Sequence, residues 1–133
     1  MNEETLQELR VQFVGSTFQE ASDQDGLTVI YFNDARLSIY AMWRLVIDGR
    51  IMASSVCDGK TSREVGAYLQ GAAVTSVTVQ GRFHDLECHF DNGASLQLFA
   101  SSTGYEHWNL HVGEYGLFIA GPDSLWSYFG PAT

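Results

Sequence analysis

The sequence predicts an α+β domain built mostly from antiparallel β-sheet, with three short helices. Composition supports this fold class, because thirteen glycines, only two prolines and 13% aromatic residues are typical of many short strands joined by glycine turns. Helix-start patterns and an internal repeat support it further. The length of 133 residues is that of one domain with a single core.

The internal repeat divides this single domain, residues 1–133, into two halves, residues 1–57 and 58–133. Gly71 lies 56 residues after Gly15, in a similar setting. The corresponding segments are Phe13–Ala21 with Leu69–Val77, Leu27–Ala41 with Asp85–Ala100, Met42–Leu45 with His107–Leu110, and Gly49–Ala53 with Gly116–Ala120. Because two copies are too few for a solenoid, we expect two fused halves with about four strands each.

Each half is predicted to begin with a helix that a capping box starts and a glycine ends. The boxes are Thr5–Glu8 and Thr61–Glu64, the apolar helix faces hold Leu6, Leu9, Phe13, Val65, Tyr68 and Leu69, and the terminating glycines are Gly15 and Gly71. A third helix is predicted to start at Gly121-Pro122-Asp123, with Leu125 and Phe129 four residues apart on one face.

Strands are predicted where apolar and polar residues alternate. Leu86, Cys88 and Phe90 occupy one face of such a segment, and Asp85, Glu87, His89 and Asp91 occupy the other. The turn signal Asp91-Asn92-Gly93 predicts a hairpin after it. The expected core includes Trp43, Ile39, Phe90, Leu96, Trp108 and Leu110.

The segment GYEHWNLH, residues 104–111, holds the main candidate for a metal site. His107 and His111 are four residues apart, the spacing that places two zinc ligands on one helical face. The match with Met42–Leu45 predicts a strand instead, in which the tryptophan and leucine face the core and the histidines face outward. A zinc site that adds His89 remains the alternative. We expect no metal and no cofactor.

The sequence also lacks the recognisable motifs of common enzymes. It has no GxSxG nucleophile motif, no P-loop and no dinucleotide-binding fingerprint. Cys57 near Lys60 is a candidate reactive thiol, but a lone loop cysteine is usually inert. Glu87 and Asp91 could form an acid–base pair only in a cleft that shifts their pKa values. The expectation is therefore a protein that is not an enzyme.

The net charge of −9 excludes some partners and favours others. Such a field repels nucleic acids and anionic membrane surfaces, and it attracts basic proteins. Acidity that only maintains solubility is the alternative. The polar start MNEETLQELR, the lack of a long apolar run and the two cysteines outside any CxxC pair predict a cytoplasmic protein.

A polar surface is predicted where the two halves differ most. Duplicated core positions should agree, so a divergent outer face is free to specialise. The predicted partner-binding residues are Asp85, Glu87, His89 and Asp91 on one strand and His107, Asn109 and His111 on a neighbouring strand. At the positions of the repeat equivalent to Asp85, Glu87 and His89, the first half has Leu27, Val29 and Tyr31. An ordinary solvated face, or docking through the apolar first-half face, remains the alternative.

The second half, mainly residues 69–126, resembles small bacterial domains found beside polymorphic toxins and described as immunity-like. The residues that carry this resemblance are Gly71, Val74, Phe90, Asp91, Asn92, Gly93, Leu96, Tyr105, Glu106, Trp108, Leu110, Gly116, Ile119 and Pro122. After the proline the chain departs from the pattern, with Asp123 and Ser124. The resemblance implies an inhibitor that neutralises one cognate toxin by occluding its active site.

Three functions follow in order of preference. The first is a non-enzymatic, protein-binding inhibitor of a cognate toxin, expected to be basic, which fits the acidity, the size and the resemblance. The second is a small-ligand or regulatory binding module, because a cleft between two half-sheets would suit one. The third, a metal-dependent enzyme at the histidines, fits least.

Overall fold

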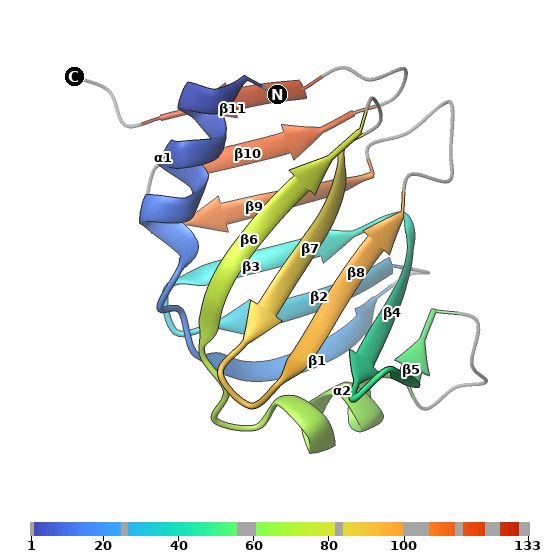
Figure 1. The fold of residues 1–133 in the computed structure, drawn as a ribbon. Helices are drawn as coiled ribbons and strands as arrows, with labels where there is room; N and C mark the ends of the chain where they lie inside the picture. Colours follow the sequence, from blue (N-terminus) through green and yellow to red (C-terminus); the bar gives the residue numbers. More distant parts are fainter. Residues whose placement is uncertain are drawn as a thin grey trace.

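A computed structural model describes residues 2–24, 27–55, 61–81, 84–99, 107–113, 116–121 and 126–130. Two antiparallel β-sheets pack face to face, and two helices flank them (Figure 1). The elements are α1 (Glu3–Phe13), β1 (Phe18–Gln24), β2 (Leu27–Phe32), β3 (Ala35–Ile39), β4 (Met42–Ile47), β5 (Arg50–Ser54), α2 (Thr61–Leu69), β6 (Val74–Gln80), β7 (Asp85–Phe90), β8 (Ala94–Phe99), β9 (Trp108–Val112), β10 (Gly116–Ala120) and β11 (Trp126–Phe129). The α+β class and the antiparallel sheets are confirmed.

Each sheet combines strands from both halves of the chain. The six-stranded sheet has the order β1-β2-β3-β9-β10-β11, and the five-stranded sheet has the order β5-β4-β8-β7-β6. Each half therefore forms a three-stranded meander in one sheet and sends its next hairpin to the other sheet. The junctions are the pairs β3–β9 and β4–β8. The described strands number five in residues 1–57 and six in residues 58–133, more than the four or so that were expected.

Local contacts near the junction of the halves also occur in pairs. Thr17 N donates to Asn33 Oδ1 at 2.9 Å, and Ala73 N donates to Asp91 Oδ1 at 3.1 Å. Thr17 and Ala73 form an isolated antiparallel bridge with each other. A bulge follows the first residue of both β1 and β6. The first five strands of each half thus pair in the same order, with similar turn contacts and bulges, and β11 is a further strand of the second half.

Both helices lie at the margins of the sheets. Helix α1 contacts β6, where Arg10 Nε donates to Val77 O at 3.0 Å, and α2 contacts β1 and β5. Gly15 and Gly71 follow the helices with φ values of 98° and 76°, so the predicted left-handed glycines are confirmed. None of the helices among the described residues is both long and apolar enough to cross a membrane.

The predicted capping box of the first helix is wrong. Asn2 is the N-cap, and its side-chain oxygen accepts a hydrogen bond from Thr5 N at 2.8 Å. Thr5 therefore lies inside the first turn, because the asparagine is an equally good cap and starts the helix three residues earlier. The side chain of Thr61, the predicted cap of α2, lies outside the described residues.

The third helix is also wrong where the structure describes it. Trp126–Phe129 forms strand β11, which pairs antiparallel with β10. The Tyr128 ring stacks on Phe118, with centroids 4.4 Å apart. Pairing with β10 provides hydrogen-bond partners for the backbone N–H and C=O groups of this short segment. It also gives the segment an aromatic contact that an isolated turn of helix lacks. Residues 122–125, where the helix was expected to start, lie outside the described residues.

One core lies between the sheets and contains residues from both sheets and both helices. All six residues expected in the core are buried, which confirms that prediction: Ile39, Trp43, Phe90, Leu96, Trp108 and Leu110. Both tryptophans also satisfy their indole N–H groups. Trp43 Nε1 donates to Thr28 Oγ1 at 3.1 Å, and Trp108 Nε1 donates to His84 O at 2.8 Å. The core therefore fixes the two sheets against each other and leaves their outward faces for function.

Candidate functional site

The predicted acidic stripe lies on the outward face of β7. Asp85, Glu87 and His89 are half-buried and alternate with core residues, as expected. His89 Nε2 lies 2.6 Å from Glu87 Oε1, so the two side chains form one hydrogen-bonded pair. Asp91 is exposed in the following turn, where its carboxylate accepts the Ala73 N–H. This last residue therefore has a structural role in closing the turn.

The other predicted stripe lies in the other sheet. Asn109 and His111 are on the outward face of β9, in the six-stranded sheet, and His107 precedes that strand. The two stripes consequently sit on the outward faces of opposed sheets, and the expected single polar face is wrong. The cause is that the chain crosses from the five-stranded sheet to the six-stranded sheet between β8 and β9. Alternation of apolar and polar residues shows which side chains face outward, but it does not show to which sheet a strand belongs.

His107 and Asn109 are also more buried than expected. Their exposed fractions are 2% and 9%. Neither ring nitrogen of His107 has a hydrogen-bond partner among the residues that the structure describes. His111 is half-buried beside Arg36, and it lines a polar pocket of about 330 Å³ together with Asp34 and Asn33. Burial and the nearby Arg36 charge lower the pKa of His111.

The strand geometry separates the three histidines considered for zinc. Four residues along a strand span about 13 Å, far more than two ligands of one zinc ion allow. His107 and His111 have this separation in sequence, and His89 belongs to the other sheet. In the part of the chain that the structure describes, no three His, Cys, Asp or Glu side chains are grouped closely enough to hold a metal ion.

Cys88 is buried in the core between the two sheets. Burial raises the pKa of its thiol to about 12, with a smaller contribution from Glu87. The thiol is therefore protonated at neutral pH and is a poor nucleophile. Cys57 and Lys60, the other candidates for thiol chemistry, lie outside the described residues.

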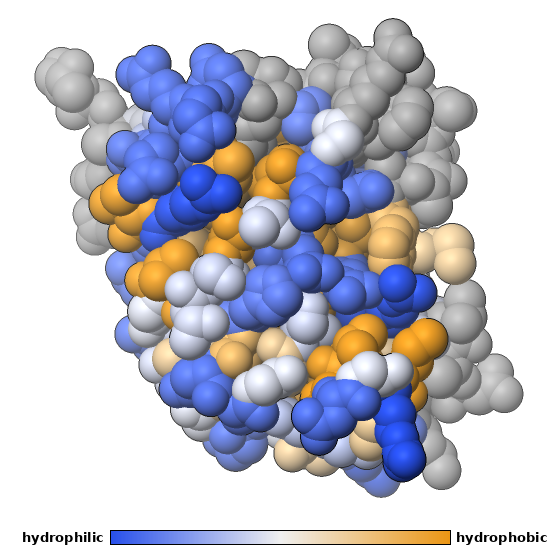
Figure 2. Space-filling model, viewed as in Figure 1, coloured by the Kyte–Doolittle hydropathy of each residue, from blue (hydrophilic) through white to orange (hydrophobic). Residues whose placement is uncertain are grey.

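A further candidate site is the outward surface of the five-stranded sheet, formed by β4, β5, β6, β7 and β8, which we call the open face. Neither helix lies in front of it (Figure 1). Strand register places its central side chains in one row, Arg44, Gln97, Glu87 and Thr78. Figure 2 shows apolar side chains gathered towards β4 and β5 and hydrophilic ones over the centre of the sheet. The open face thus has an apolar end and an acidic end.

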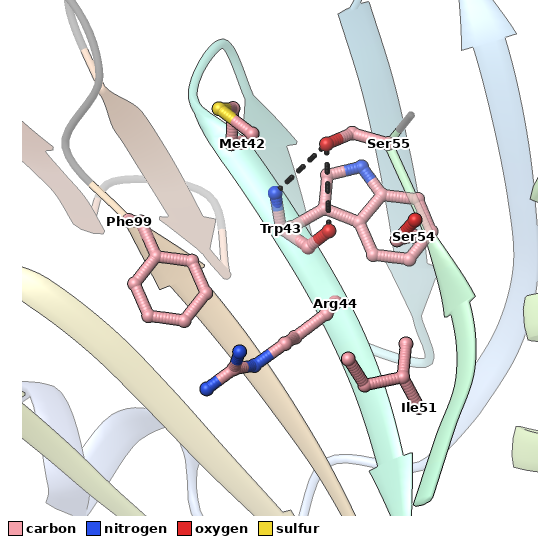
Figure 3. A pocket seen from close by; sticks show the side chains of 7 residues that line it. All are labelled: Met42, Trp43, Arg44, Ile51, Ser54, Ser55 and Phe99. Atoms are coloured by element: carbon pink, nitrogen blue, oxygen red, sulfur yellow. Dashed lines mark hydrogen bonds between the residues drawn. The ribbon is translucent and has the colours of Figure 1, made fainter. Parts of the chain in front are cut away.

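The apolar end contains a pocket of about 330 Å³ (Figure 3). The residues that line it are Met42, Trp43, Arg44, Ile51, Ser54, Ser55 and Phe99. Met42 and Ile51 are 50% and 60% exposed, although large apolar side chains are usually buried. A neighbouring polar pocket of about 210 Å³ is lined by Asp85 and Glu87 and shares Arg44 and Phe99 with the first.

Arg44 is held in place between the two pockets. Its Nε donates to Gln97 Oε1 at 2.6 Å, and its guanidinium carbon lies 4.8 Å from the centroid of the Phe99 ring. The ion pairs among the described residues are Arg10–Glu3 and His89–Glu87, so no described carboxylate is paired with Arg44. The open face therefore presents a positioned cation between an apolar pocket and an acidic stripe.

Sequence reasoning missed the apolar end of the open face. The available signal was the alternation in Met42–Ile47, which places Met42 and Arg44 opposite the buried Trp43. The alignment of this segment with His107–Leu110 drew attention to the repeat instead. It could not reveal that β4 pairs with β8, which brings Phe99 beside Met42.

Comparisons with known proteins add no assignment, since no protein-family model, curated protein or solved structure matches the chain.

Proposed function

We propose that this chain is a non-enzymatic, protein-binding domain that docks through its open face. The observation that carries the proposal is the uncovered sheet surface on which exposed Met42 and Ile51 lie near the acidic residues Asp85 and Glu87. Protein interfaces commonly combine an apolar centre with a polar rim. The apolar end would supply contact area, and the acidic end would orient the partner.

The proposed partner is a basic protein, and the resemblance makes it a cognate toxin whose active site the open face covers. A net charge of −9 attracts a basic surface at long range, and it accelerates association more than it slows dissociation. A cytoplasmic setting goes with this proposal because Cys88 is a buried free thiol, as is usual in a reducing compartment.

The proposed docking residues differ from the set expected from the sequence. Asp85, Glu87 and His89 are retained, while His107, Asn109 and His111 belong to the opposite side of the domain. Met42, Ile51 and Phe99 take their place. The apolar first-half alternative is disfavoured, because Val29 is only 4% exposed and the neighbouring Tyr31 hydroxyl accepts a hydrogen bond from Gln24.

We also propose that the domain arose by duplication of a half-length unit. The shared strand order, the paired bulges and the matching turn contacts at Asn33 and Asp91 support this origin. Equivalent faces then occur once on each sheet. Their side chains differ, which is the pattern expected if one face has specialised for docking.

The test of docking compares a double substitution of exposed apolar residues on the open face with a single one on α1. Met42→Asp combined with Ile51→Asp places charge on the open face, whereas Val11→Asp does so on α1, where Val11 is 68% exposed. We expect the wild-type protein and the Val11 variant to capture the same basic protein from a bacterial lysate and to inhibit its activity. The open-face variant should do neither. Equal capture by all three proteins would contradict the proposal.

The charge contribution is tested on the isolated complex. Asp85→Lys with Glu87→Lys should slow association and flatten its dependence on salt, because rim charges act mainly on the association rate. Both side chains lie on the outward face of β7, so the domain should stay folded, with a small decrease in melting temperature from the lost Glu87–His89 pair. An unchanged association rate and salt dependence, measured by stopped flow, would show that the acidic stripe is not part of the interface.

A second candidate function, binding of a small ligand, is favoured by one observation. The pocket of about 330 Å³ at the apolar end has the volume of a small-molecule site and combines apolar walls with a few polar groups.

A further inference from the structure

Among the described residues that line the pocket at the apolar end of the open face, Arg44 is the charged one. Its walls are the side chains of Met42, Ile51 and Phe99, which come from β4, β5 and β8 (Figure 3). A pocket of this composition would hold the apolar part of a ligand, and Arg44 would favour a ligand that also carries a negatively charged group.

The guanidinium of the exposed Arg44 is restrained in the absence of a ligand. Two contacts restrain it, the hydrogen bond from Nε to Gln97 and the position over the Phe99 ring. An arginine has five N–H donors, and the bond to Gln97 uses the Nε–H. The fork of the terminal nitrogens suits the two oxygens of a carboxylate. Because these contacts already restrain the side chain, a ligand would lose less of its binding free energy to ordering it.

The pocket floor is fixed as well. Ser55 Oγ accepts a hydrogen bond from Trp43 N at 3.0 Å and donates to Trp43 O at 3.4 Å. These two hydrogen bonds connect the end of β5 to the start of β4. The indole of Trp43 is anchored in the core through Thr28, so the backbone beneath the pocket cannot shift easily.

We propose that this pocket binds a small apolar monocarboxylate, such as a short fatty acid or an arylalkanoic acid. The carboxylate would pair with Arg44, and the apolar body would lie against Met42, Ile51 and Phe99. This inference rests on the second candidate function and not on docking to a protein partner, and a bound ligand would compete with that partner for the apolar end of the open face.

Charge distinguishes a monocarboxylate from other ligands. A phosphate dianion would meet one cation among the described lining residues, with Asp85 and Glu87 in the adjoining pocket and a net charge of −9 on the protein. Repulsion grows with the charge of the ligand, so a single negative charge is favoured over two. A neutral ligand of the same shape would leave Arg44 without a counter-ion and gain only apolar contact.

The experiment is an NMR titration of the full chain with phenylacetate. We expect saturable shifts at Met42, Ile51 and Phe99, with a Kd of about 1 mM, the scale of a small ligand with one charged contact. Phenylethanol, which lacks the carboxylate, and phenyl phosphate, which carries more charge, should bind at least about tenfold more weakly. Arg44→Gln should weaken phenylacetate binding by at least about tenfold.

The matched control is Arg50→Gln. Arg50 is an exposed residue at the start of β5 and does not line the pocket, so its loss changes the net charge equally. Phenylacetate should bind this variant as it binds the wild type, and circular dichroism should show both variants folded. Absence of saturation at about 10 mM would overturn the proposal. Equal binding of phenylethanol, or equal losses in the Arg44 and Arg50 variants, would also overturn it.

Discussion

His84 shows how burial changes the chemistry of a single residue. It lies in the turn before β7 with an exposed fraction of 5% and a φ of 61°. Its backbone oxygen accepts the Trp108 indole N–H, so the turn is tied to β9. Burial, with a contribution from His107, lowers the pKa of His84 below its usual value of 6.5. The folded protein therefore disfavours the protonated imidazole.

A pH dependence of stability follows. The unfolded chain binds the proton more readily than the folded chain, so the contribution of His84 to stability is complete above about pH 6.5 and is lost as the pH falls through the lowered pKa. His84→Asn removes the titration, and asparagine tolerates a positive φ. We expect the melting temperature of the wild type to fall more steeply between about pH 6.5 and pH 5 than that of the variant. Parallel curves would contradict this assignment.

The start of α1 shows how much one polar side chain determines about an element. Asn2 caps the helix, and Glu3 and Glu4 in the first turn also interact favourably with its N-terminal dipole. Asn2→Ala should lower the free energy of unfolding by about 1 kcal/mol, whereas Asn2→Asp keeps the acceptor and should cost much less. Urea denaturation of the three proteins measures both effects. Equal losses in the two variants would mean that Asn2 is not the stabilising cap.

Helices and strands could be predicted from the sequence where the local pattern of apolar and polar residues fits one type of secondary structure and not the other. Alternation in Asp85–Phe90 correctly placed Cys88 and Phe90 in the core and Glu87 outside. The four-residue spacing of Leu125 and Phe129 does not distinguish a helix from a strand, because residues four apart share a face in either, and Phe129 lies in strand β11. The strand pairs that build the open face are long-range, and no local pattern in β4 reveals that its neighbour is β8.

At the scale of the whole molecule, the exchanged hairpins make each half depend on the other. Residues 1–57 alone would leave β3 without β9 and the β4–β5 hairpin without β8. An isolated two-stranded hairpin is marginal in water. We expect fragments 1–57 and 58–133 to be unfolded separately and to regain the circular dichroism spectrum of the intact domain when mixed. A fragment that melts cooperatively by itself would contradict this dependence.

The same exchange also affects the order in which the chain can fold. The partner of β4 is β8 and the partner of β3 is β9, so neither sheet can close before most of the sequence has been synthesised. Pairings this distant in sequence raise the contact order and slow folding. Until β8 and β9 emerge, the nascent chain exposes unpaired strand edges, and this interval is when it is most vulnerable to aggregation.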